Sequence, residues 1–243
     1  MTIVPPPRAR RIHAELPRLK REQATMRYGI TDALRHRIID GTLPPGTQVA
    51  EEWVSREMGV SRGPVREALR ELENEGLLVV RPYRGAFVNE ITTEELRDVL
   101  IPVRFILERQ ACLRALPTMT EKDFEALDNI TEQMRSVAAS QDEGTLLTLV
   151  DLDIAYHEYL TELGGQYHTL QLWRSIQPRI RAGFFQLGSR HRDLLEIAKE
   201  HKALLAVLRT RDPEAALDAL ETHICTTQLE LVNQLGDTSG GNP

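Results

Sequence analysis

The sequence predicts a mainly α-helical fold in two parts, an N-terminal winged helix-turn-helix and a C-terminal all-helical bundle. Between residues 25 and 76, three amphipathic stretches are separated by glycine-containing breaks, which is the pattern of three short helices. Residues 77–89 change to the pattern of two short strands around an arginine-bearing turn, Tyr83-Arg84-Gly85. From Thr93 onward only amphipathic helical stretches follow, and these favour a bundle of helices.

The first two helices each carry one apolar face. We expect them over residues 25–40 and 50–58, separated by the Gly41–Gly46 break, with a tight Gly59–Ser61 turn leading into the third helix. Their apolar positions are Ile30, Ala33, Leu34 and Ile38 in the first helix and Ala50, Trp53, Val54 and Met58 in the second. Two helices joined by a tight turn to a third indicate a helix-turn-helix.

The third helix has a stripe of arginines opposite an apolar face. Its apolar residues follow the spacing i, i+3, i+4, i+7, while three arginines recur every four residues on another face. The apolar set is Val65, Ala68, Leu69 and Leu72, and the arginine set is Arg62, Arg66 and Arg70. We expect Ser61 to cap the start and Gly76 to close the end.

The order of these features decides between two interpretations of the arginine stripe. On an isolated helix such a stripe is often only the solvated face, but here the tight turn, the stripe and the hairpin follow one another. Arginines at the start of such a helix can bond guanine edges or phosphates, and an arginine in the wing can reach the backbone or the minor groove. We therefore interpret the third helix as a DNA-recognition helix.

The composition excludes several classes of protein. At 243 residues and 41% hydrophobic content, the chain has room for two domains that each bury a core. A charged fraction of 27%, with no run of about 18 apolar residues and no secretory signal in residues 1–20, predicts a cytoplasmic protein without a membrane span. Because only Cys112 and Cys225 occur, we expect neither a disulfide framework nor a cysteine zinc site.

Charge is distributed unevenly along the chain. The net charge is −6, yet residues 1–90 contain 15 Lys and Arg against 12 Asp and Glu, whereas residues 91–243 contain 15 against 24. This asymmetry suggests a DNA-facing N-terminal module joined to an acidic module with another task.

The N-terminal motifs resemble the DNA-binding domain of GntR-family transcription regulators. The similarity runs from Leu43-Pro-Pro-Gly46 through residues 59–69 and Glu75-Gly76-Leu77 to residues 84–88 (Arg-Gly-Ala-Phe-Val). It implies DNA contacts from Ser61, Arg62, Gly63, Arg66, Arg84 and Gly85. The chain departs from the pattern at Glu52, where some members carry an arginine, which puts a phosphate contact from the second helix in doubt.

The C-terminal part is expected to contain six helices, over residues 93–116, 121–139, 143–163, 167–187, 190–210 and 213–235. Pro102 and Pro178 fall inside two of them and should kink or divide these helices. Together with the N-terminal part, this predicts a flexible basic segment at 1–21, the winged helix-turn-helix at 22–90, a helical domain at 93–235 and a disordered tail at 236–243.

Three histidines and one aspartate have suggestive spacing. Asp153 and His157 are four residues apart on one helix, so they face the same way. His201 and His223 each lie 11 residues from Asp212 at a helical turn, which places both rings about 16 Å from that turn in an antiparallel pair. If the helices pack together, these residues form a ligand set for a divalent metal. Spacing alone also fits histidines that serve the core or the surface.

The same region resembles the helical ligand-binding FCD domain of the FadR subgroup. The similarity covers residues 153–157 (Asp-Ile-Ala-Tyr-His), Glu200-His201 and the stretch from Ala215 to His223-Ile224. It implies Asp153, His157, His201 and His223 as metal ligands, for zinc first and for nickel or manganese as alternatives. It also covers residues 104–108, in which Arg104 either pairs with Glu108 one turn later or contributes to an effector pocket.

The two resemblances together imply a metabolite-responsive transcription regulator, in the first place a repressor, and not an enzyme. They imply a homodimer on a palindromic DNA operator and a small organic acid as effector. Two alternatives stay open. The metal is structural or absent and another effector fills the bundle, or the Asp and His residues form a metalloenzyme site, although no general base, nucleophile or phosphate loop accompanies them.

Overall fold

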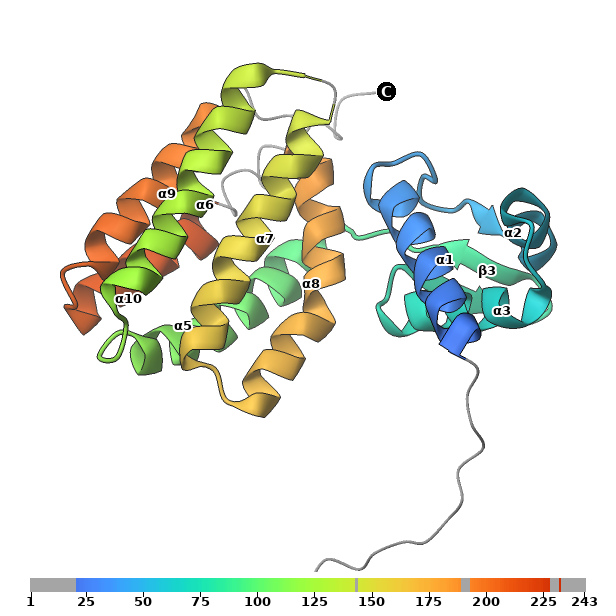
Figure 1. Cartoon of the computed structure of the whole chain (residues 1–243), viewed down its shortest axis with the longest axis horizontal. Coiled ribbons are helices and arrows are strands. Elements are labelled where there is room, and N and C mark those ends of the chain that lie inside the picture. The colour runs from blue at the N-terminus through green and yellow to red at the C-terminus, as the bar shows by residue number, and fades with distance from the viewer. Residues whose placement is uncertain (1–20, 143, 189–192, 228–231, 233–243) are drawn as a thin grey trace, which may run out of the picture.

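The computed structural model describes residues 21–142, 144–188, 193–227 and Val232. It contains a small N-terminal domain of three helices and a sheet, and a larger bundle of helices beside it (Figure 1). The fold class predicted from the sequence is confirmed. Of the expected basic segment at 1–21, residues 1–20 lie outside the described residues and Arg21 begins the first helix. The expected tail at 236–243 also lies outside the described residues.

The N-terminal domain is a winged helix-turn-helix. Its helices are α1 (Arg21–Ile39), α2 (Glu51–Met58) and α3 (Arg62–Asn74), and its strands are β1 (Gln48–Val49), β2 (Leu78–Arg81) and β3 (Gly85–Val88). The sheet has the order β1-β3-β2, and both pairings are antiparallel, with Leu78 opposite Val88. Strand β1 was not predicted, because two residues are too few to show an alternating pattern.

Helix α3 has the buried face that its spacing predicts. Val65, Ala68, Leu69 and Leu72 are all buried. Gly76 has φ +75°, and the amides of Gly76 and Leu77 donate to the carbonyls of Glu73 and Leu72, so glycine closes the helix as expected. The expected cap at the other end was wrong, since Ser61 occupies the N-cap position but its side chain makes no capping hydrogen bond.

The bundle contains the remaining helices in an up-and-down arrangement (Figure 1). Its first helical run comprises α4 (Thr93–Glu95), the π-helical η1 (Leu96–Leu100) and α5 (Ile101–Ala115), and it changes from π-helix to α-helix just before Pro102. The other helices are α6 (Glu121–Ser140), α7 (Thr145–Gly164), α8 (Tyr167–Gly188), α9 (Leu195–Leu208), α10 (Pro213–Glu221) and the π-helical η2 (Thr222–Thr226).

One helix boundary and one proline differ from expectation, and the predicted end of the last helix lies outside the described residues. Helix α9 begins at Leu195 rather than Arg190, and the Asp193 carboxylate accepts a hydrogen bond from the Leu195 amide just before the first turn. The expected last helix is described only to residue 227 and at Val232. Pro178 lies inside α8 without dividing it.

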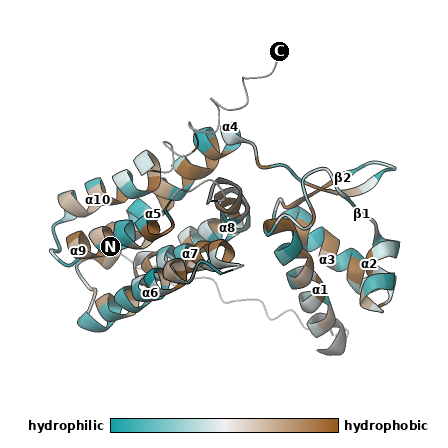
Figure 2. Ribbon diagram, turned by 90° about the horizontal axis from the view of Figure 1, so that it is seen from above, coloured by the Kyte–Doolittle hydropathy of each residue, from teal (hydrophilic) through white to brown (hydrophobic). Residues whose placement is uncertain are grey.

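Apolar and polar residues alternate along the helices (Figure 2), and the apolar side chains form the core of each domain. The bundle core surrounds α7, which packs against α5, α6 and α8. Within the part of the chain that the structure describes, no helix combines the length and apolarity needed to cross a membrane.

Candidate metal centre and DNA-binding surface

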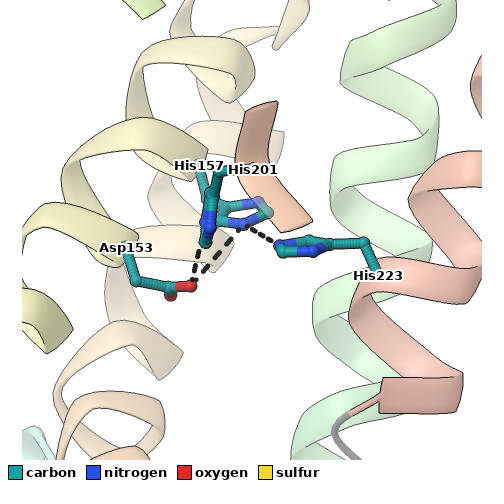
Figure 3. A group of neighbouring side chains, drawn as sticks. All are labelled: Asp153, His157, His201 and His223. Atoms are coloured by element: carbon teal, nitrogen blue, oxygen red, sulfur yellow. Dashed lines mark hydrogen bonds and ion pairs between the residues drawn. The ribbon is translucent and has the colours of Figure 1, made fainter. Parts of the chain in front are cut away.

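Asp153, His157, His201 and His223 come together in the bundle and are called the Asp/His cluster here. Helix α7 supplies the first two, α9 supplies His201 and η2 supplies His223. The four side chains point toward one another (Figure 3). All four are buried, with exposures between 0 and 6%. The π-helical turn of η2 is notable because such turns are rare and often occur at functional sites.

The distances in the cluster are those of a compact ligand set. One potential ligand atom from each residue can be chosen so that all four lie within 4.8 Å of one another. The Nε2 atoms of His157 and His223 are 3.0 Å apart, and Nε2 of His201 is 3.2 Å from Oδ1 of Asp153. The His201 and His223 ring centroids lie 4.4 Å apart in an edge-to-face arrangement, so the two rings meet between α9 and η2.

Two nitrogens of the cluster are buried without a hydrogen bond of ordinary geometry, although one of them, Nε2 of His201, lies 3.2 Å from the Asp153 carboxylate. These atoms are Nε2 of His201 and Nδ1 of His223. Since buried polar side-chain atoms almost always have a partner, their exceptions need an explanation. Three imidazoles and one carboxylate are donors suited to zinc or another divalent transition metal, so the residues present fit such an ion.

The electrostatics of three members of the cluster, Asp153, His157 and His223, also favour the protonation states that bind a metal. Burial lowers the pKa of His157 and, together with the neighbouring His201, lowers the pKa of His223 well below the usual value. Burial works against ionisation of Asp153, but the guanidinium of Arg104 beside it outweighs this cost, so the pKa of Asp153 is lowered. Neutral imidazoles and an ionised carboxylate are the forms that bind metals.

A second layer of residues orients the ligands. Glu108 Oε2 lies 2.5 Å from Nδ1 of His157, while its Oε1 accepts hydrogen bonds from Arg104 and Trp173 at 2.8 and 2.9 Å. Nδ1 of His157 therefore carries the proton and Nε2 is left as a ligand atom. A backbone carbonyl orients His201 in the same way, since Nδ1 of His201 lies 2.7 Å from the carbonyl oxygen of Ile197.

Arg104 takes the pairing that its spacing allows and adds another. It binds Glu108 one turn later and also Asp153, with a nitrogen–oxygen distance of 3.2 Å, and it is 1% exposed. Direct contact between Arg104 and an effector stays a prediction. The sequence showed only the Arg104–Glu108 pair, because the bonds from Glu108 to His157 and Trp173 depend on how α5, α7 and α8 pack.

Replacing Glu108 with glutamine should weaken metal binding by about 10- to 100-fold, the usual cost of losing an outer-layer partner of a ligand histidine. The amide keeps the size of the side chain but removes the charge that holds the Nδ1 proton of His157. A competition titration of zinc against a chelator measures the effect. Glu162→Gln, on an exposed residue of α7, is the control, and equal affinities for both variants would contradict this role of Glu108.

The residues expected to contact DNA are all exposed. Ser61, Arg62, Gly63 and Arg66 lie at the start of α3, and Arg84 and Gly85 lie where the wing turns into β3. The wing turn is tied to the rest of the sheet by a hydrogen bond of 2.7 Å from the Gln48 side chain to the Arg84 carbonyl. Recognition helix and wing thus present their polar residues to solvent together.

Both arginines near the start of α3 pair with carboxylates of α2. Arg66 binds Glu51 through two nitrogens at 3.0 Å each, and Arg62 lies 3.6 Å from Glu52. The sequence did not indicate these pairs, which connect residues 10 and 15 positions apart. Because a carboxylate repels phosphate, the Glu52 position disfavours the backbone contact that an arginine there would make.

Comparison with known proteins gives the same two-part division. Residues 27–88 match the family model "Bacterial regulatory proteins, gntR family", and residues 99–226 match the FCD domain. The HTH-type transcriptional repressor RspR of Escherichia coli strain K12 is 30% identical over 195 residues, which cover 79% of this chain and 82% of RspR. The gluconate operon transcriptional repressor of Bacillus licheniformis is 26% identical over 205 residues, 80% of each chain.

Solved structures share the fold. Escherichia coli McbR/YncC superposes with a TM-score of 0.71 at 21% identity, covering 86% of this chain and 98% of that one. A putative GntR regulator from Rhodococcus sp. RHA1 gives a TM-score of 0.72 at 23% identity, with the same coverage. The chain belongs to the gntR family of bacterial transcription regulators and carries an FCD domain.

Proposed function

We propose that this regulator is a repressor whose helical domain binds a divalent metal and a small carboxylate effector. One observation carries the proposal: the Asp/His cluster places four buried donors within 4.8 Å and leaves two of their nitrogens without a hydrogen bond of ordinary geometry. Zinc is the first candidate, with nickel and manganese as alternatives. When bound, such an ion supplies a Lewis-acidic centre that a carboxylate oxygen can approach.

The names of similar proteins support the choice of first effectors to test. One relative is named as a gluconate operon repressor and another as a probable D-xylose utilization operon repressor. Gluconate is a hydroxy acid, the chemical class whose oxygens chelate a metal of this kind. Sugar acids and small hydroxy acids are therefore the effectors we would try first. Because these relatives are named as repressors, we propose that such an effector relieves repression.

Operator DNA is proposed to meet α3 and the wing of each subunit. The six exposed residues named above supply the contacts, and Arg62 and Arg66 are the side chains that can bond guanine edges in the major groove. The carboxylates of Glu51 and Glu52 hold these two arginines in the free protein. Binding must exchange those ion pairs for DNA contacts, which costs little because ion pairs between solvent-exposed side chains contribute little to stability.

A homodimer is proposed to form through the first helical run of the bundle. Val99 and Ile106 lie along η1 and α5 and are 49% and 64% exposed. Large apolar side chains left in water on a helix are typical of an interface. Two copies would present two recognition helices to the two halves of a palindrome.

Changing Ile106 to aspartate should convert the dimer to a monomer and weaken operator binding, because a charge would be buried at the proposed interface. Light scattering gives the mass of the particle, and fluorescence anisotropy gives the affinity. Arg135→Asp introduces the same residue at an exposed site on α6 and should leave both unchanged. A dimer that persists in Ile106→Asp would remove this face from the interface.

The experiment that tests the proposed function starts from DNA selected in vitro from a random duplex library by the full-length protein. Affinity for the selected duplex is then measured with zinc-loaded protein in the presence and absence of gluconate and related acids. We expect at least one acid to weaken binding. If none does so, while zinc-loaded protein binds DNA tightly, the effector part of the proposal fails and the DNA-binding part stands.

A further inference from the structure

Helix α8 is the part of the bundle that lies against the N-terminal domain. It packs on α5 and α7 and also contacts α1. Two views show it at the side of the bundle that faces the winged helix (Figures 1 and 2). A single helix thus touches both the surroundings of the Asp/His cluster and the domain that contains the recognition helix.

The inner face of α8 reaches the outer layer of the cluster at two points. Trp173, fully buried, donates its indole N–H to Glu108, the residue that holds Nδ1 of His157. Further along the helix, Phe184 lies against Arg104, with 5.0 Å between the guanidinium carbon and the ring centroid. Through these contacts α8 packs against the residue that orients a histidine ligand and against the arginine that binds Asp153.

Between these two points, Arg179 extends toward the recognition helix. Its guanidinium lies directly against Gly76, so close that a Cβ at position 76 would overlap Nε and come within 2.9 Å of Cζ. Gly76 is the residue with φ +75° that closes α3. Glycine adopts this backbone conformation without strain, and its lack of a Cβ leaves room for the arginine in the position that it takes here.

The charge of Arg179 suits this place. The carboxyl-terminal end of a helix has a partial negative charge, because its last carbonyls have no intrahelical partners, and a cation there is favourable. Leu96 provides a parallel contact at the start of the bundle, since a Cβ on Gly183 of α8 would lie 2.5 Å from its Cδ2. Helix α8 therefore contacts both the residue that closes the recognition helix and the η1 segment that follows the linker.

We infer that Arg179 is a positioning residue for the recognition helix, and that through it α8 passes the state of the Asp/His cluster to the DNA-binding domain. This inference rests on the proposed metal centre and on the proposed role of α3. A packed helix moves as a unit when one of its anchors shifts.

Amide hydrogen exchange at residues 75–77 tests the inference, because these amides lie beside Arg179. Full-length protein is compared in zinc-loaded and chelator-treated forms, with zinc content measured in each sample. We expect zinc to change exchange at these amides by at least about threefold in the unaltered protein. In Arg179→Ala and in Arg179→Gln, which keeps much of the side-chain length, the two forms should exchange alike while zinc is still bound.

Arg174→Ala is the matched control. This arginine is on α8 and exposed, and it pairs with Glu158 and Glu162 rather than with the N-terminal domain, so its loss should leave the zinc-dependent difference intact. A difference that persists in both Arg179 variants would overturn the inference, as would unaltered protein that binds zinc without any change at residues 75–77. Failure to take up zinc would instead contradict the metal centre, and with it the coupling.

DNA affinity gives a second readout, because a purely structural role of Arg179 would not change the ratio of the affinities of zinc-loaded and chelated protein. If Arg179 only stabilised the domain interface, its loss would alter affinity equally in the loaded and the chelated protein. The inference requires the ratio of the two affinities, of the order of 5- to 150-fold for typical couplings, to fall toward one in Arg179→Ala and to stay unchanged in Arg174→Ala. A ratio that is the same in both variants would overturn it.

Discussion

Loss of the Arg62 side chain is expected to abolish specific DNA binding without unfolding the protein. An arginine that bonds a guanine contributes about 1–3 kcal/mol to discrimination, and a dimer loses two such contacts. The folded state should be unaffected, because Arg62 is exposed and its single ion pair, to Glu52 at 3.6 Å, belongs to a class worth about 0–1 kcal/mol. Anisotropy with a selected duplex and with a random duplex measures the specificity ratio, and thermal unfolding measures stability.

Arg56→Ala separates base recognition from general charge. It removes one exposed arginine from the neighbouring helix α2, so it should lower affinity for both duplexes by a similar factor and leave their ratio close to that of the unaltered protein. If Arg62→Ala kept normal affinity for the selected duplex, the proposal that Arg62 contacts bases in the major groove would be wrong.

Replacing His201 with alanine should remove the stabilisation that zinc gives to the helical domain. A ligand that binds only the folded state stabilises it by about 2.7 kcal/mol at 100 times its Kd. His201 is 1% exposed, and Nε2 is one of the two nitrogens of the cluster without a hydrogen bond of ordinary geometry, so the variant loses a donor that points into the site. We expect zinc to raise the Tm of unaltered protein and to leave that of His201→Ala unchanged.

The comparison must use the zinc-dependent difference in Tm, because loss of a buried ring also creates a cavity that destabilises the protein without metal. His168→Ala is the control: His168 is exposed on α8 and is absent from the cluster. It should keep the full zinc effect. The same increment in Tm for His201→Ala would exclude this histidine from the metal site. If the assignment is right, the response to the effector should be blunted in this variant as well.

Much of the fold followed from periodic patterns in the sequence. The apolar spacing of Val65, Ala68, Leu69 and Leu72 predicted the buried face of α3 correctly, and Pro102 lies just after the place where the first helical run changes from π-helix to α-helix. These features are local, since each depends on residues within a few turns of one helix. The approach of His201 to His223 could also be predicted from the sequence, because two residues at equal distances from a helical turn lie at the same height in an antiparallel pair of helices.

What could not be predicted depends on contacts between distant segments. Nothing in the local sequence connects Glu108 to His157 or to Trp173, which lie 49 and 65 positions away. The pairing of Glu52 with Arg62 and the seat of Arg179 on Gly76 likewise require packed helices. Local signals also failed at helix ends, where Ser61 has the right residue type for a cap but makes no capping bond.

The metal content of the protein, purified without a histidine tag or chelator, is the measurement that tests the proposed centre most directly. It should be made beside the variants Asp153→Ala and His223→Ala, which remove donors from two different helices. We predict about one zinc, nickel or manganese ion per chain in the unaltered protein and a loss of metal in both variants. No metal in the unaltered protein, even after reloading with all three ions, would contradict the centre.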